Sequence, residues 1–304
     1  MSLSVLVPST ITSAMLTSTV AETDYSAWSS GTTYAVGNRC ISTTTHRVYE
    51  SLVASNTNHD PTDISNRIGA TPWWLDVSAT NLWKMFDDQT TSQTTAATTM
   101  TVTLEPGSFN AFALLGISAE TITATVTDLG SSTVLYSYTG DLEDSAPEDY
   151  YEYFFSAFSP QTDFIVDGLD SYSNMQLIVT LSVVSGDVKC GMLQVGDLRV
   201  LGLTQYGAKA KPKTYSYIKV NEYGENEIVR RKKATDLSCT AWLKVEEANS
   251  VTNTLGDLLD VPCLWIASDL QQHRALRVFG LGSGDISFDH YQDCLLTLNV
   301  NGLI

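Results

Sequence analysis

The chain has 304 residues, of which only 17% are charged, and its formal net charge is −17. Such an acidic balance argues against nucleic-acid binding and against attachment to anionic membranes, because both require a basic surface. Thr and Ser supply much of the polarity, and Thr in particular suits the solvent-facing sides of β-sheets.

Apolar runs in this sequence are far shorter than the ~20 residues that a membrane-spanning helix needs. The first residues also lack the basic start of a signal peptide. We therefore expect synthesis in a cytoplasm and no insertion into a membrane. The cysteines are scattered without a CxxC pair, so we expect buried, reduced thiols with no disulfide and no metal. They are Cys40, Cys190, Cys239, Cys263 and Cys294.

Residues 1–24 are apolar and rich in Thr and Ser. They predict either a short strand or an arm that docks on another subunit.

Residues 25–83 are crowded with aromatic side chains and turn residues. Strand-like runs at 32–42 and 46–54 predict a hairpin, and residues 55–72 predict an irregular loop. The segment has few aliphatic residues to form a core of its own, so some rings should pack on the rest of the protein or face solvent as a binding surface. The rings are Trp28, Trp73, Trp74, Trp83, Tyr25, Tyr34 and Tyr49.

Residues 84–203 contain regular short strands separated by turn residues, which favours a β-sandwich or jelly roll. Two strands have clear inward faces, formed by Met100, Val102 and Leu104 and by Ile122, Ala124 and Val126. The acidic stretch from residue 141 predicts a loop that leads into an aromatic strand, YYEYFF.

Residues 204–304 predict two strands joined by a turn at 222–226, a third strand, one helix at 247–260 and further strands. The helix would be capped by Asn249 or Ser250. Its apolar stripe would be Val251, Leu255, Leu258 and Leu259. The predicted fold class is therefore mainly β, with a small aromatic β module (25–83), a β-sandwich body (84–203) and a C-terminal β-rich domain with one helix (204–304).

Catalytic and metal-binding patterns are weak. His46, His59, His273 and His290 lie in no known catalytic motif. The glycines at 280–285 predict a β-turn, because no phosphate-loop lysine follows. The basic residues 230–233 favour a subunit contact. The spacing of the acidic residues does not fit an EF-hand, which favours a solvated loop over a calcium site. These are Asp141, Glu143, Asp144, Glu148 and Asp149. We expect no enzyme activity, catalytic residue, metal or cofactor.

The aromatic segment resembles the small chitin-binding-type carbohydrate modules of the family 5/12 kind. The matching positions, in order, are Trp28, Tyr34, Gly37, Val48, Tyr49, Glu50, Pro61, Pro72 and Trp73. The resemblance implies a carbohydrate-binding surface, for which the candidate residues are Trp28, Tyr34, Tyr49, Trp73 and Trp74. One departure is that residues 51–61 lack the exposed aromatic that the family normally carries there.

The remaining chain is similar to virion structural proteins of tailed bacteriophages in the composition and order of its sequence stretches. The stretches that suggest this are WWLDVSATNLWKMFD, VTLEPGSFNAFALLGI, YYEYFF, GLTQYGA and the closing NVNGLI. The resemblance implies a tail-tip or baseplate component in the virion, assembled in several copies as a homo-oligomer with other tail subunits, and able to touch host polysaccharide. The alternatives are a host-glycan adhesin, with exposed rings on one surface, and a polysaccharide-degrading enzyme, with paired carboxylates in a cleft.

Overall fold

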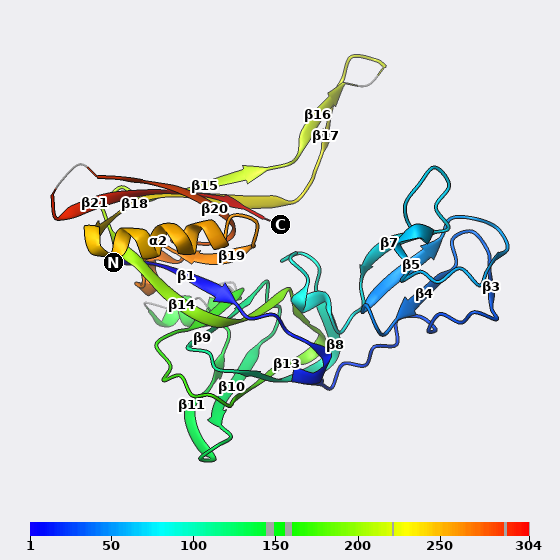
Figure 1. Ribbon diagram of the computed structural model, residues 1–304, viewed down its shortest axis with the longest axis horizontal. Helices are drawn as coiled ribbons and strands as arrows, with labels where there is room; N and C mark the ends of the chain where they lie inside the picture. Colours follow the sequence, from blue (N-terminus) through cyan, green and yellow to red (C-terminus); the bar gives the residue numbers. More distant parts are fainter. Residues whose placement is uncertain (144–148, 156–159, 221, 289–290, 304) are drawn as a thin grey trace.

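The computed structural model describes all of the chain except residues 144–148, 156–159, 221, 289–290 and 304. It is mainly β, with one long helix in the described residues, which confirms the predicted fold class. A two-sheet body carries the aromatic module on one side and a two-stranded ribbon that projects from its upper edge (Figure 1).

The larger sheet of the body has nine strands. In spatial order these are β12 (Asp163–Val166), β9 (Ala111–Leu115), β14 (Met192–Thr204), β1 (Ser2–Pro8), β19 (Cys263–Ile266), β20 (Arg277–Ser287), β21 (Asp293–Gly302), β18 (Lys233–Lys244) and β15 (Lys209–Thr214). The end of β14 also pairs with β18, which closes six of these strands, from β14 round to β18, into a barrel. The sheet therefore unites ranges 84–203 and 204–304 in one body.

The first strand of the chain lies in the middle of this sheet. β1 pairs with β14 on one side and with β19 on the other. Leu3, Val5 and Leu6 are fully buried, as expected for an apolar strand with neighbours on both edges. Of the two alternatives for this segment, the strand is therefore correct. Residues 2–8 form no arm for another subunit, because their own chain covers them.

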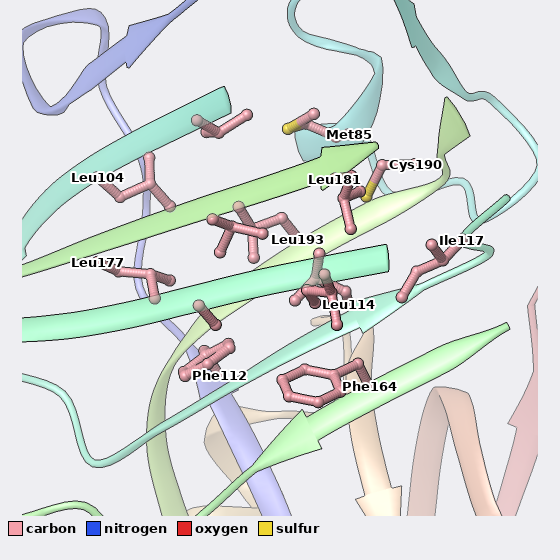
Figure 2. Packing of buried hydrophobic residues seen from close by; sticks show 14 of the residues in the cluster. Met85, Leu104, Phe112, Leu114, Ile117, Phe164, Leu177, Leu181, Cys190 and Leu193 are labelled. Atoms are coloured by element: carbon pink, nitrogen blue, oxygen red, sulfur yellow. The ribbon is translucent and has the colours of Figure 1, made fainter. Parts of the chain in front are cut away.

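The second sheet packs on the β9–β14 part of the first to form a sandwich. Its strands, in order, are β11 (Thr133–Asp141), β10 (Thr121–Asp128), β13 (Met175–Cys190), β8 (Thr94–Gly107) and β2 (Leu16–Ser18). The six predicted inward residues of β8 and β10 are all buried, which confirms the two strands and their faces. They meet Phe112, Leu114 and Leu193 of the larger sheet (Figure 2).

The barrel has its own core, which helix α2 (Val245–Asp257) completes by packing on β18, β20 and β21. Val251, Leu255 and Leu258 are buried as predicted, whereas Leu259 is exposed. The predicted capping residues are wrong, because the helix begins at Val245, which places Asn249 and Ser250 inside it. Glu246 and Glu247 in the first turn favour this start through the helix dipole.

The glycines at 280–285 form no turn, and the prediction there is wrong. All three lie inside β20, where side chains and backbone approach closely. A Cβ on Gly282 would lie 2.2 Å from a ring carbon of Trp265, and one on Gly280 would lie 2.2 Å from the Asn301 oxygen. Trp265 is completely buried, and its Nε1 donates to the Gly280 carbonyl at 3.0 Å. Gly282 therefore makes room for this indole, and Gly280 allows the backbone of β21 to approach closely.

The predicted aromatic strand YYEYFF is also wrong, since Tyr150–Phe155 forms the short helix α1. A helix pairs its backbone groups within the segment and needs no neighbouring strand. Of the acidic loop, residues Asp144 and Glu148 lie outside the described residues, as does His290. The described residues also contain four 3₁₀ turns: η1 (Ser13–Met15), η2 (Ile64–Asn66), η3 (Lys84–Phe86) and η4 (Gln271–Leu276).

Candidate functional site: the aromatic module

The aromatic module is an insertion between two neighbouring strands of the smaller sheet. The chain leaves the body after β2 and returns to it at β8, which pairs with β2. The module contains β3 (Thr33–Tyr34), β4 (Arg39–Ser42), β5 (Arg47–Ser51), β6 (Asn56–Thr57) and β7 (Trp74–Ala79). The pairing of β4 with β5 confirms the predicted hairpin. Strand β7 adds to β5, and β3 pairs with β6.

All five predicted site residues belong to one cluster, but the structure places them at different depths. Tyr49 and Trp74 are completely buried, with exposed fractions of 0% and 1%, and Tyr34 is nearly so. Tyr34 and Trp74 pack edge to face, with ring centroids 5.0 Å apart. The module therefore does have a core of its own, built from aromatic rings and Cys40 in place of aliphatic side chains.

The polar atoms of these three rings all have partners within the module. Trp74 Nε1 donates to the His59 carbonyl at 2.8 Å, and the Tyr34 hydroxyl accepts from the Ser29 amide at 3.0 Å. The Tyr49 hydroxyl pairs with Thr45 Oγ1 at 2.9 Å. Because solvent does not reach their faces, these rings hold the module together and offer no surface on which a sugar can stack.

Trp28 and Trp73 are only partly buried and pack against the same cluster. One face of Trp73 is covered by His59, whose ring is stacked on it at 3.6 Å between centroids. His59 is held in turn by Asn56 at 3.0 Å. The Trp28 Nε1 is inaccessible to solvent and has no hydrogen-bond partner. Carbohydrate binding by the module stays a prediction, and these two indoles are the members of the predicted set that keep exposed surface.

The module also carries a group of charged side chains that residue patterns did not predict. Arg39 pairs with Glu50 at 2.7 Å and donates to the Tyr25 hydroxyl at 3.2 Å. Tyr25, which is 40% exposed, lies under the Arg39 guanidinium. The register of β4 and β5 places Arg39 opposite Glu50. An opposite-charge pair across a predicted hairpin is the signal that could have found it.

The entry and exit of the module are fixed on each other and on the body. Glu22 accepts from Thr80 Oγ1 at 2.8 Å and pairs with His46 Nδ1 at 3.1 Å. Trp83, just after the exit, stacks on the His46 ring at 4.1 Å. Asn81 exchanges hydrogen bonds of 2.8 and 2.9 Å with Thr95 at the start of β8. These contacts join the two ends of the module to each other and, through Asn81, to β8.

A cavity of about 410 Å³ begins at Trp83, where the chain returns from the module to the body. It is also lined by Phe86, Asp87, Asp88 and Gln194, with Asp260 from the C-terminal range. Burial raises the pKa of the Asp87 carboxyl, although its hydrogen bonds with Ser92 and Gln89 oppose the shift. Gln194 Oε1 is buried without a partner. The sequence contained no signal for this cavity, because its residues come from distant parts of the chain.

In the described part of the chain, no three His, Cys, Asp or Glu side chains are grouped so that they could hold a metal ion. Nor does any helix of that part have the length and apolar character needed to span a bilayer. Comparisons with protein-family models, with characterised proteins and with solved structures found no match.

Proposed function

We propose that the chain is a non-enzymatic structural subunit of a bacteriophage tail tip or baseplate, made in the host cytoplasm and assembled in several copies in the virion. The observation that carries the proposal is the insertion of the module between the paired strands β2 and β8, with hydrogen bonds that join its two ends. A binding or contact unit inserted between paired strands, with Glu22, His46 and Asn81 fixing its ends, keeps its direction when the body is held in a particle. The order of sequence stretches similar to virion proteins supports the same proposal.

Purified particles provide the test. We expect mass spectrometry of tails to detect the chain in several copies per particle. Antibodies against the module should label the tail tip in electron micrographs. Particles that lack the protein would overturn the proposal.

A second function, contact with host surface glycan, is favoured by the half-buried indoles and by the Tyr25–Arg39–Glu50 group of the same module. Sugar rings stack their C–H faces on aromatic rings, while neighbouring polar groups bind the hydroxyls. Trp28, Trp73 and Tyr25 retain the exposed surface that such stacking needs, and Arg39 and Glu50 supply donors and acceptors.

Full-length protein should be incubated with insoluble chitin and with host surface polysaccharide, and the bound fraction measured. We expect Trp73→Ala to reduce retention, because it removes an indole that keeps exposed surface. Tyr206→Ala is the matched control, since Tyr206 is 93% exposed and lies outside the module. Wild-type protein that is not retained by any polysaccharide would exclude this second function and leave the structural proposal standing.

A further inference from the structure

The ribbon that projects from the body packs on no other sheet of the described chain. It consists of β16 (Tyr217–Val220) and β17 (Asn226–Val229), which pair with each other and form a separate two-stranded sheet. Figure 1 shows it extending away from the body beyond β15. A two-stranded hairpin alone is at best marginally stable in water, because it has nothing on which to bury its side chains.

One face of the ribbon is aliphatic. Ile218 lies opposite Ile228 in the register, and Val220 follows two residues along on the same face. Their exposed fractions are 64%, 63% and 61%. The other face differs, because it pairs Lys219 with Glu227 and holds Tyr217 under the Arg231 guanidinium at 5.2 Å. A row of exposed aliphatic side chains on a projecting element is typical of an interaction surface.

Positive charge gathers at the base of the ribbon and not on the ribbon itself. The base, residues 209–216 and 230–233, contains seven of the 17 Lys and Arg residues and no acidic residue, whereas residues 217–229 contain Lys219 and three glutamates. The base therefore carries a formal charge of +7, the ribbon −2 and the rest of the chain −22. Such a separation of charge attracts the basic segment of one molecule to the acidic body of another.

We propose that the ribbon and its basic base dock together on the acidic body of a second copy of this chain, which covers Ile218, Val220 and Ile228. The proposal rests on the multi-copy assembly of the proposed function and names the element that makes the contact. The two surfaces that meet are different, so the contact is head to tail. Repeated contacts of this kind generate a closed ring or an open filament, according to the rotation between neighbours.

The test measures the mass of the full-length protein in solution as a function of concentration, by light scattering or sedimentation. We expect wild type to self-associate. Ile218→Ser with Ile228→Ser should raise the dissociation constant at least ~10-fold, because two aliphatic side chains lose their buried contact. Val134→Ser is the control, since Val134 is 56% exposed on β11, far from the ribbon in sequence.

Charge provides a second readout that does not depend on the aliphatic face. Raising the salt concentration should weaken association, since the attraction between exposed charges is screened. Arg230→Glu with Lys219→Glu should weaken it at low salt and remove most of the salt dependence. The far-ultraviolet circular dichroism of each variant should match wild type, because every substituted side chain is exposed.

Wild-type protein that stays monomeric at all concentrations would overturn the docking proposal, as would ribbon variants that associate like wild type. An equal loss of association in the Val134 control would also contradict it. The proposed function is tested separately, because absence from purified particles overturns that function whatever the association result. A chain that is present in particles but monomeric in solution overturns only the docking of copies through the ribbon.

Discussion

Single residues decide how closely the elements of the body approach each other, and Gly282 is the clearest case. Its missing side chain leaves room for the completely buried Trp265. We expect Gly282→Ala to lower the free energy of unfolding by about 1–3 kcal/mol, since the added methyl group overlaps a rigid ring. Urea denaturation of the full chain measures the change.

Gly256→Ala is the matched control for that substitution. Gly256 lies in helix α2, and a Cβ there meets nothing within 4 Å. Alanine is the better helix former, so this variant should be more stable than wild type by about 0.5–1 kcal/mol. Equal unfolding midpoints for Gly282→Ala and wild type would show that the Trp265 ring can move aside at no cost.

At the scale of the element, the aromatic module should behave as a unit that depends on its ring core. Trp74 is the largest side chain in that core. Trp74→Ala should cost about 3–5 kcal/mol, a typical loss for a buried tryptophan. We expect hydrogen exchange to accelerate over residues 33–79, while the body keeps its protection. Leu75→Ala, at a neighbouring position that is 49% exposed, should leave the exchange unchanged. Faster exchange throughout the body would contradict an independent module core.

The strands were predictable where one face is buried, and the reason is local. Ile122, Ala124 and Val126 alternate with polar residues because successive side chains of a strand point to opposite faces, of which only one is buried. The prediction of a turn at the glycines of β20 was wrong because the residues that need their small size lie in other strands. Gly282, for example, faces Trp265 of β19, and only the fold brings the two together. The segment YYEYFF was predicted as a strand from its strand-forming residues. It forms helix α1, and no strand among the described elements pairs with it.

The sequence indicated which aromatic residues form the candidate site, but not which of them are buried and which are exposed. The resemblance of residues 25–83 to small carbohydrate modules pointed to all five rings that form the cluster. Whether a ring is core or surface depends on which strands pair, and strand β7 buries Trp74 while leaving Trp73, one residue earlier, half-exposed. The junction contacts of Glu22 and the cavity at Asp87 join distant segments, so no local pattern encodes them.

At the scale of the whole molecule, buried thiols should make the free energy of unfolding fall at alkaline pH. All five cysteines are free and buried. Burial raises the pKa of Cys40, Cys190 and Cys263 to about 12, and that of Cys239 to about 11. In an unfolded chain a thiol ionises near pH ~8.5. Between these limits the folded protein binds more protons than the unfolded chain, so the free energy of unfolding must fall as pH rises.

The stabilising contribution of the neutral thiols is fully present below about pH 8.5, where they are protonated in both the folded and the unfolded state. It is lost progressively as pH rises toward about 12. We expect the urea midpoint of wild type to decline from pH 8 to pH 10.5. Tyr and Lys also titrate there, so the comparison must be with a variant carrying Ala at positions 40, 190, 239 and 263. That variant starts less stable, because the substitutions leave small cavities, but its midpoint should fall less steeply with pH. Parallel declines in the two proteins would mean that the folded state does not hold the thiols in their neutral form.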